Sequence, residues 1–557
     1  MMPQIAQLVG GAGTGKTREL LNIMDGVVER LHDPHLCGFV SFTRAACDEA
    51  ADRAADQFNM TRASLRQHGW FKTLHGVCYR ALGIGEELLT DNAASRKWVE
   101  EAMQEPLEGQ RETTEDLSDG LDVFAQTDTE AGRALALWGT ARNRLAPLRP
   151  TWEEADQCDQ RTPDYGRCVE LIDRYEQHKA VEGRMDFTDI LLRFAGYWPH
   201  VDGPSRCEPR GEVPGLPAWI ADEMQDFSRL LDACFRRLIE HPECRWAYCA
   251  ADPWQSIYRF GGADHRCFFD YPTAKRRVMP KSWRCPAEIL RLGESILSEC
   301  SDYWDRGIAP AGPGGEIDEA HLGNGWADDV DPRDSWLILA RTNYQAARLA
   351  KRLDDLGVPW LPTKKDRSCF WKAPVRNAAL AALLSLEVGA PIDGSQWLAI
   401  LKHLPSMAEG VRLLRHGVKT ELSDLDNESA QDRWPLVFPS SLDELGATEG
   451  LIQALASRRW RQWVEGADRY AEAMDRWGRE VVEAPKVRCG TIHAAKGLEA
   501  DNVAVLTTIS RPVFEAAQSD EGGDEERRVR YVAVTRAKKR LVIINERRPA
   551  FKWGLEP

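Results

Sequence analysis

The segment that most constrains the fold is a glycine-rich stretch near the N-terminus, residues 10–17, with the sequence G-G-A-G-T-G-K-T. It matches the phosphate-loop pattern G-x-x-x-x-G-K-[ST]. The apolar run 5–9 before it predicts a buried strand, and the apolar spacing within 18–30 predicts a helix after it. Backbone N–H groups, a helix N-terminus and a lysine then converge on the phosphates of a nucleotide. The alternative, a turn that only joins strand to helix, leaves the intact G-K-T unexplained.

An acidic pair supplies the second half of such a site. The apolar run 218–221 leads directly into Asp222-Glu223. In phosphate-loop NTPases an Asp in this position holds Mg²⁺, with the hydroxyl of Thr17 as its partner, and the Glu polarises the attacking water. Taken alone, the pair reads better as an acidic cap on the helix expected at 227–238. With the loop, it predicts ATP and Mg²⁺ as cofactors. The nucleotide-binding residues expected in the loop are Gly10, Gly11, Ala12, Gly13, Thr14, Gly15, Lys16 and Thr17.

Length and composition bound the class of protein. With 557 residues the chain is too long for one core, and about three to four domains are expected. No apolar run approaches the length of a membrane span, so no membrane is expected as a partner. The 14 cysteines include no C-x-x-C pair, which favours reduced thiols in the cytoplasm over a metal or disulfides. A net charge of −15 argues against a protein that coats nucleic acid, but not against one that grips a strand in a local groove.

Strand and helix signals alternate twice along the chain. Strands are expected at 36–42, 218–221 and 246–250, and again at 336–340, 487–491, 503–508 and 541–544. Between them, the acidic segment 85–184 and the segment 371–483 show helical spacing without strand alternation. The simplest organisation is an α/β protein with two α/β units, each interrupted by a helical insertion.

Ten short stretches, in this order, resemble the motifs of superfamily 1A DNA helicases of the UvrD/Rep/PcrA type. A single motif is weakly specific, but their order along residues 8–545 is specific. The stretches are V-G-G-A-G-T-G-K-T (9–17), S-F-T-R-A-A-C-D-E-A (41–50), T-L-H-G (73–76), D-F-T-D-I-L (186–191), D-E-M-Q-D-F (222–227), A-D-P-W-Q-S-I-Y-R-F-G-G-A-D (251–264), S-W-R (282–284), R-T-N (341–343), T-I-H-A-A-K-G-L-E (491–499) and Y-V-A-V-T-R-A-K-K-R-L (531–541).

The resemblance implies two RecA-like parallel-sheet domains, each with a mainly helical insertion. The first RecA-like domain, with the phosphate loop, would comprise 1–84 and 185–279, interrupted by an acidic insertion at 85–184. The second would comprise 280–372 and 484–557, interrupted by a reduced insertion at 373–483. The chain would be a compact member of the family.

The resemblance also gives roles to residues outside the loop. Gln255, Arg284 and Arg536 would meet the γ-phosphate, where guanidinium groups stabilise the charge of the transition state. Arg18 and Trp283 would sandwich the adenine, and Glu499 would bind the ribose. Together with Lys16 and Glu223, the first three form the expected catalytic set. The family carries a Gln upstream of the loop that reads adenine, whereas only nine residues precede Gly10 here, so strict ATP preference stays open.

Aromatic and polar residues in the motifs are expected to bind a single strand of DNA. Aromatic rings stack on bases, and polar side chains contact the sugar-phosphate backbone. Phe260-Gly261 stands where the family usually has Trp-Arg, which predicts a weaker contact there. The bland alternative is that Phe42 and Phe260 are core aromatics beside a strand. The stacking candidates are Phe42, Tyr258 and Phe260, and the backbone candidates are Thr43, Arg44, Thr73, His75, Arg341, Asn343, Thr491 and His493.

The function implied is an ATP-driven translocase and helicase that acts on single-stranded DNA and on junctions of single and double strands. K-G-L-E at 496–499 implies 3′→5′ movement. Replication or repair proteins are the expected protein partners. One alternative is a DNA-stimulated ATPase that remodels protein–DNA complexes without unwinding duplex, which the short second insertion favours. The other is a phosphate-loop kinase or signalling NTPase, which leaves the later motifs unexplained.

Overall fold

The computed structural model describes residues 3–42, 44–85, 88–90, 93–107, 129–158, 161–323, 325–364, 367–422, 425–547 and 551–553. Their contacts divide the chain into two compact units. Unit 1 comprises Met1–Leu322, Leu339–Asn343 and Thr491–Pro557. Unit 2 comprises Gly323–Ile338 and Tyr344–Gly490. Each unit is described by itself.

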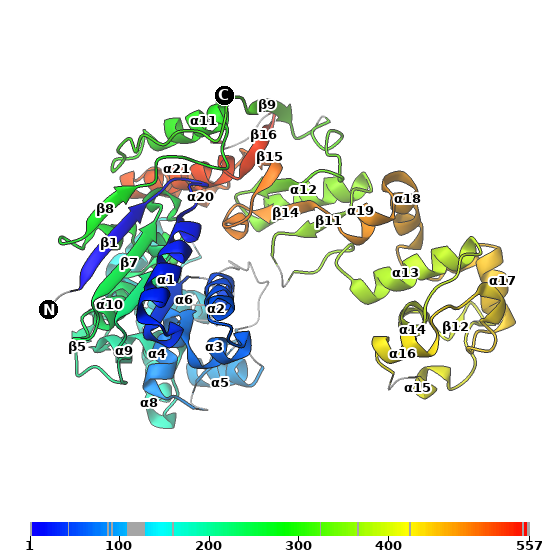
Figure 1. Ribbon diagram of the computed structural model, residues 1–557, viewed down its shortest axis with the longest axis horizontal. Coiled ribbons are helices and arrows are strands. Elements are labelled where there is room, and N and C mark those ends of the chain that lie inside the picture. The colour runs from blue at the N-terminus through cyan, green and yellow to red at the C-terminus, as the bar shows by residue number, and fades with distance from the viewer. Residues whose placement is uncertain are drawn as a thin grey trace. The chain divides into compact units, whose positions relative to one another are not determined.

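A parallel six-stranded sheet carries the phosphate loop in unit 1 (Figure 1). The loop follows a central strand, whose last residue, Val9, lies opposite Ala251 and Val278 of the neighbouring strands. The residues that follow these strand ends therefore meet at one edge of the sheet. The order is β3 (Trp70–Thr73), β2 (Cys37–Ser41), β6 (Ala218–Ala221), β7 (Trp246–Ala251), β1 (Gln4–Val9) and β8 (Lys275–Val278).

Helices cover both faces of this sheet, and its strands are therefore apolar on both sides. Leu8 and Ile220 pack on one face against α1 (Lys16–Leu31), α2 (Arg44–Gln57) and α3 (Arg62–His68). Ile5 and Trp219 pack on the other against α4 (Leu74–Leu82), α9 (Phe187–Ala195) and α10 (Arg229–Ile239). Successive side chains of β1 and β6 point to opposite faces of the sheet, so each apolar run buries residues against the helices on both sides.

The segment between α4 and α9 is helical in its described residues, as expected. Its helices are α5 (Ala93–Met103), α6 (Glu130–Arg144), α7 (Leu148–Cys158) and α8 (Tyr165–Glu182), and they share a core that contains Leu135 and Leu171. Residues 108–128 of this segment lie outside the described residues.

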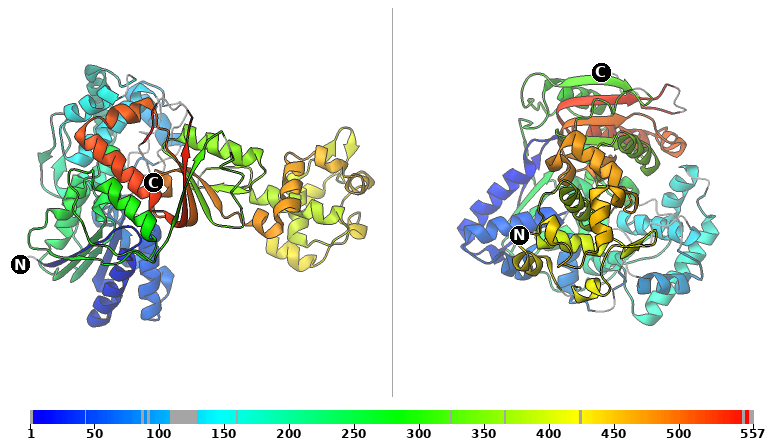
Figure 2. Two further views of the ribbon diagram at one scale, coloured as in Figure 1. Left: turned by 90° about the horizontal axis from the view of Figure 1, so that it is seen from above. Right: turned by 90° about the vertical axis from the view of Figure 1, so that its right-hand side faces the viewer.

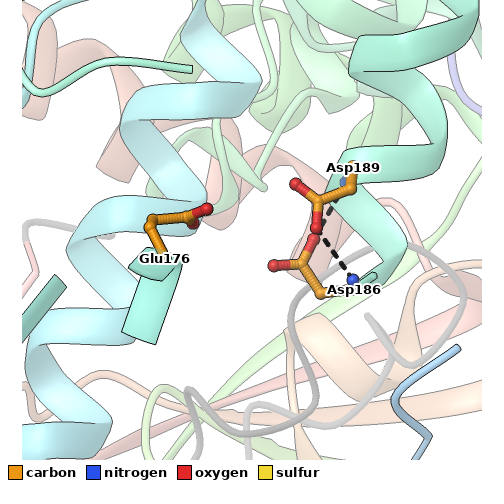
Figure 3. A group of neighbouring side chains, drawn as sticks. All are labelled: Glu176, Asp186 and Asp189. Carbon is orange, nitrogen blue, oxygen red and sulfur yellow. Dashed lines mark hydrogen bonds between the residues drawn. The ribbon is translucent and has the colours of Figure 1, made fainter. Parts of the chain in front are cut away.

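A buried charge cluster joins this insertion to α9. The carboxylates of Glu176, Asp186 and Asp189 face one another (Figure 3) and are close enough to hold a metal ion. The ammonium of Lys179 already lies among them, 3.0, 2.8 and 2.6 Å from their oxygens in that order, and Arg142 lies 2.9 Å from Asp186. Burial and the charge of Asp186 raise the pKa of Asp189 to about 6. Two protein cations therefore take the place that a metal would need.

A second six-stranded sheet is parallel as well, as its described strand pairs show, so the chain has two RecA-like α/β sheets as expected. In unit 1 its strands β9 (Glu316–His321), β16 (Ala537–Asn545) and β15 (Ala500–Leu506) lie beside α11 (Ala287–Leu297) and α21 (Asp520–Val534), which pack on each other. The remaining strands are β10 (Trp336–Ala340), β14 (Val487–Thr491) and β11 (Trp360–Pro362), in the order β11-β14-β10-β15-β16-β9.

Unit 2 holds the second group of insertion helices, coloured light green to orange in Figure 2. The expectation of no strand in this segment is wrong at one place, because a short antiparallel hairpin pairs Met407–Ala408 with Val411–Arg412. No described helix is long and apolar enough to cross a membrane. The helices of unit 2 are α12 (Asn343–Asp355), α13 (Pro374–Glu387), α14 (Gly394–His403), α15 (Val418–Glu421), α16 (Asn427–Arg433), α17 (Glu449–Ala456), α18 (Ala467–Trp477) and α19 (Arg479–Glu483).

Candidate active site

The phosphate loop runs from β1 into α1 as its sequence predicts. Gly13 and Gly15 have φ of 66° and 81°, a conformation that glycine adopts without strain. A Cβ on Gly10 would lie 2.3 Å from the hydroxyl oxygen of Thr14, so a larger residue does not fit there. Lys16 Nζ donates to the carbonyl of Gly11 at 3.1 Å. The lysine is thus held over the loop, where a phosphate would accept from it.

The S-W-R stretch lies directly against the loop, within unit 1. Ser282 Oγ donates to the Ala12 carbonyl at 2.8 Å, and the Trp283 N–H donates to the Gly13 carbonyl at 2.7 Å. These bonds occupy two loop carbonyls. Of the loop N–H groups, that of Gly10 donates to the Ala251 carbonyl and that of Ala12 to the Tyr531 hydroxyl. The Trp283 indole is 70% exposed, and Arg18 on the first turn of α1 is also exposed. Both predicted base-stacking side chains therefore present surfaces that a base could cover.

Thr17 and Asp222 form the predicted metal-binding pair. Thr17 Oγ1 donates to Asp222 Oδ2 at 2.6 Å, so both oxygens are close enough to share one cation. Burial, with the charge of Glu223, raises the pKa of Asp222 to about 7. A buried carboxylate with too little positive charge beside it favours a divalent cation, and these hard oxygen ligands fit Mg²⁺.

Glu223 follows Asp222 with a φ of 55°, which is unusual for a residue other than glycine. Burial alone would raise the pKa of its carboxylate, but the charges of Lys16 and Lys496 and a hydrogen bond from Gln225 outweigh burial and lower it. Glu223 is therefore ionised at neutral pH and can accept a proton from water. Left-handed backbone conformations of residues other than glycine are costly and cluster at functional sites, which supports a functional role for Glu223.

Gln255 and Arg536 are also together, as predicted. Arg536 Nη2 donates to Gln255 Oε1 at 2.9 Å, and Gln255 Nε2 donates to Asp252 Oδ2 at 2.6 Å. Burial and the nearby Arg284 lower the pKa of Arg536 to about 10, so it stays charged at pH 7. Arg284 donates to Glu499 at 2.6 Å, and Glu499 also pairs with Lys538 at 2.5 Å. In this arrangement the predicted ribose-binding Glu499 holds the predicted arginine finger.

The predicted stacking residues form one aromatic cluster. Phe42 stacks on Tyr258 with ring centroids 5.5 Å apart, and Phe260 lies 5.7 Å from the His493 ring. Phe260 is 38% exposed, whereas Tyr258 is only 5% exposed. Phe260 is thus available to a base, whereas the buried Tyr258 packs against Phe42 and Phe260. The interpretation of Phe260 as a core residue does not fit its exposure.

Helix α6 of the first insertion holds the backbone of this cluster. Thr140 Oγ1 donates to the Phe260 carbonyl at 2.8 Å, and Arg144 donates to the Arg259 carbonyl at 3.3 Å. A Cβ on Gly262, whose φ is 93°, would lie 2.7 Å from the Cβ of Asn143. Only glycine therefore allows the close approach of α6 to this turn.

Arg44, Thr73 and His75 lie together along a second surface, a cavity of about 360 Å³ that Arg66 and Lys72 also line. Burial, with the charge of Arg44, lowers the pKa of His75 to about 4, so its ring is neutral at pH 7. Nε2 of His75 and Nε2 of His493 are buried and have no hydrogen-bond partner within the described residues. Buried polar atoms of this kind need a partner, which a ligand can supply.

The remaining candidates for contact with the DNA backbone are less available to a ligand or lie outside the described residues. The guanidinium of Arg341 is bound to Glu526 of α21, with its shortest N–O distance 2.6 Å. The hydroxyl of Thr491 accepts from the Ala494 N–H at 3.2 Å, and Asn343 begins α12. Thr43 lies outside the described residues.

Lys496 is a functional candidate that the sequence analysis did not single out. Its ammonium donates to both oxygens of Asp226 and to the Gln255 carbonyl, each at 2.6 Å. It also lies 4.8 Å from the centre of the Tyr258 ring. One side chain thus contacts both the γ-phosphate motif and the aromatic cluster. Its position inside K-G-L-E was the signal that could have identified it.

Two parallel sheets, a phosphate loop, a hydrogen-bonded Thr–Asp pair that fits Mg²⁺, an ionised Glu and a buried Arg are the features of a nucleoside triphosphatase of the two-sheet helicase class. Sequence comparison agrees with this class. Residues 2–273 match the model of the UvrD/REP helicase N-terminal domain, and residues 474–548 match that of the UvrD-like helicase C-terminal domain. The chain therefore belongs to the UvrD/Rep family of superfamily 1 helicases, and it is a DNA-dependent ATPase and helicase.

Individual relatives are similar over nearly the whole chain. The candidate ATP-dependent DNA helicase YjcD of Bacillus subtilis is 23% identical over 96% of this chain and 76% of its own length. DNA helicase II of Escherichia coli is 21% identical over 96% of this chain and 81% of its own. The ATP-dependent DNA helicase PcrA of Leuconostoc citreum is 21% identical over 97% of this chain and 79% of its own. Family membership thus excludes the kinase alternative.

Proposed function

We propose that this chain is an ATP- and Mg²⁺-dependent translocase that moves 3′→5′ along single-stranded DNA and unwinds duplex at junctions. The observation that carries the proposal is the position of Lys496, whose ammonium contacts Asp226, the Gln255 carbonyl and the Tyr258 ring. A change in the aromatic cluster when a base stacks there is transmitted through this one side chain to the residues around the γ-phosphate.

The hydrolytic step follows from the residues at the loop. Mg²⁺ held by Thr17 and Asp222 would neutralise charge on the β- and γ-phosphate oxygens. Lys16 and the loop N–H groups bind those oxygens, and Glu223 accepts the proton of the attacking water. Arg536 is in place beside Gln255 to stabilise the charge that grows on the transferred group. Arg284, which donates to Glu499 in this structure, would join these residues at the γ-phosphate once that bond is broken.

Strand binding combines stacking with neutral polar contacts. Phe260 offers an exposed face for a base, and the two orphaned histidine nitrogens offer hydrogen bonds to sugar or phosphate oxygens. Because His75 is neutral at pH 7, its contact adds no counterion release, and the salt dependence of binding comes from Arg and Lys side chains such as Arg44 and Lys72. This arrangement favours binding without base-specific readout.

Polarity and unwinding are tested with duplexes that carry a 3′ or a 5′ single-stranded tail. The proposal predicts ATP-dependent strand displacement from the 3′-tailed duplex only, and ATP hydrolysis that rises when oligonucleotide is added. Displacement from the 5′-tailed duplex alone would reverse the proposed polarity. Hydrolysis that is unaffected by oligonucleotide would remove the coupling role of Lys496.

A second candidate function is displacement of proteins from DNA without unwinding. The short helical segment of unit 2 favours it, because less protein is available there to engage duplex. A single strand with a biotin-bound streptavidin in the path of movement separates the two. Streptavidin removal without strand displacement from either tailed duplex supports the second candidate.

A further inference from the structure

Asp252, which the proposed mechanism does not use, lies at the centre of a buried hydrogen-bond network beside the phosphate loop. The residue is fully buried. Its Oδ2 accepts from Gln255 Nε2 at 2.6 Å and from the Tyr531 hydroxyl at 3.3 Å. Its Oδ1 accepts from Arg306 Nη1 at 3.0 Å. Three donors from three separate segments therefore converge on one carboxylate.

The network also reaches the phosphate loop itself. The Tyr531 hydroxyl accepts from the backbone N–H of Ala12 at 2.9 Å while it donates to Asp252. A Cβ on Gly11 would lie 3.3 Å from Arg306 Nη1 and 3.4 Å from the Tyr531 hydroxyl, so both side chains lie against the loop. Tyr531 and Arg536 share the end of α21 and the residues that follow it. The loop, Gln255 and Arg536 are thus tied to one another through Asp252.

The chemistry of this network fixes which way the amide of Gln255 faces. An ionised carboxylate can only accept and a guanidinium can only donate. With Asp252 on one side and Arg536 on the other, the amide must direct Nε2 to Asp252 and Oε1 to Arg536. A turned amide would place Oε1 against the carboxylate and Nε2 against the guanidinium, and would lose both bonds. The second hydrogen on Nε2 then stays available for a phosphate oxygen or the attacking water.

Arg306 gives this buried carboxylate a positively charged partner. Its side chain has no exposed surface and also donates to Glu294 at 2.6 Å. Burial alone would lower the pKa of this guanidinium, but the neighbouring Tyr531, Asp252 and Glu294 outweigh burial and raise it above its usual value. A buried negative charge is costly without a positive partner, so Arg306 supports the carboxylate that holds the Gln255 amide in one orientation.

We propose that Asp252, Tyr531 and Arg306 are positioning residues for ATP hydrolysis, which act by fixing the amide of Gln255 between the phosphate loop and Arg536. The inference rests on the proposed function, because it assumes that Gln255 acts at the γ-phosphate. None of the three residues needs to touch nucleotide. Their loss lowers turnover while the affinity for nucleotide and for oligonucleotide changes little.

The test uses two isosteric variants, Asp252→Asn and Tyr531→Phe, with Gln255→Ala as reference. Asp252→Asn presents an N–H to Gln255 and turns its amide, so single-turnover ATP hydrolysis falls about 10- to 100-fold. Tyr531→Phe loses one hydroxyl, and its single-turnover rate of ATP hydrolysis falls about 5- to 10-fold. Fluorescent-nucleotide affinity and oligonucleotide affinity stay near those of the unmodified protein when measured below each variant's thermal midpoint. That midpoint falls in Asp252→Asn, because Arg306 loses the charge of its buried partner. Arg306→Lys keeps the charge and retains more activity than Arg306→Met.

A double-mutant cycle distinguishes action through Gln255 from a general structural effect. In the Gln255→Ala background, Asp252→Asn costs no further rate, because there is no amide left to orient. Equal losses with and without Gln255 would overturn the inference. If Gln255→Ala hydrolyses ATP normally, the proposed role of Gln255 fails and the inference fails with it. If Gln255→Ala is slow but Asp252→Asn is normal, only the inference fails.

Discussion

Replacement of Phe260 by Ala is the most direct test of the proposed binding site for single-stranded DNA. The ring is 38% exposed and contacts Tyr258 and His493, so its removal costs about 1–2 kcal/mol of stability, against about 3–5 kcal/mol for a fully buried Phe. A base that stacks on an aromatic ring contributes about 1–3 kcal/mol. Affinity for an oligonucleotide should therefore fall about 5- to 150-fold. ATP hydrolysis without DNA should persist.

The measurements are fluorescence anisotropy with a labelled oligo-dT and thermal denaturation of each variant. Tyr258→Ala is the buried comparison: it loses the stack on Phe42 and the contact with Lys496, and should melt clearly earlier. Trp198→Ala is the exposed control, since this 56% exposed aromatic lies on the β4 strand (Tyr197–Trp198), outside the cluster. A Phe260→Ala protein that melts early and binds oligo-dT normally when folded would refute the reasoning.

Four further outcomes follow. Glu223→Gln should abolish hydrolysis but retain nucleotide, since the phosphate and metal contacts remain; wild-type turnover would remove Glu223 from the role of base. Arg536→Ala should lower turnover by about 10³-fold or more with a modest loss of nucleotide affinity, measured by single-turnover hydrolysis. Arg341→Ala should lower the slope of log affinity against log salt by about 0.7 if its guanidinium leaves Glu526 for a phosphate, and an unchanged slope would keep it a structural ion pair. The pKa of His75 is lowered to about 4, so the unfolded chain binds more protons between pH 4 and 6.5 and stability falls as pH drops through that window. His75→Gln should flatten this part of the stability curve, measured by denaturation at several pH values.

The central strands of the first sheet were predictable from the sequence, but its edges were not. β1, β2, β6 and β7 are apolar runs because helices cover both their faces. The edge strand β8 has the sequence K-R-R-V and is largely exposed, and β9 of the second sheet, E-I-D-E-A-H, carries several acidic residues. Edge strands have one unpaired side and bear charges that discourage further pairing, so they lack the apolar signal.

The candidate catalytic residues beside the phosphate loop could be proposed from the sequence because the chemistry expected of them needs a fixed local spacing. Lys16 follows the glycines of its own loop, and Asp222 and Glu223 directly follow the end of β6. Arg306 belongs to none of the stretches that carry the family resemblance, and it reaches Asp252 only because separate segments of the chain meet there. A residue whose role depends on such convergence leaves no pattern in the sequence around it.

The contact of Thr140 with the Phe260 carbonyl has a consequence for protein engineering. Helix α6 of the first insertion contacts the turn at Phe260 through Thr140 and reaches Asp186, the N-cap of α9, through Arg142. Lys179 of α8 joins the same charge cluster, whose carboxylates are drawn in Figure 3. A chimaera that exchanges this insertion with that of a relative must carry Arg142 and Lys179 together with their three carboxylates. Without these two cations the chimaera would bury the carboxylates of Asp186 and Asp189 without a positive partner, and the turn that carries Phe260 would shift. The insertion is therefore not freely exchangeable: if Phe260 binds DNA as proposed, an exchange would weaken that binding although Phe260 itself is unchanged.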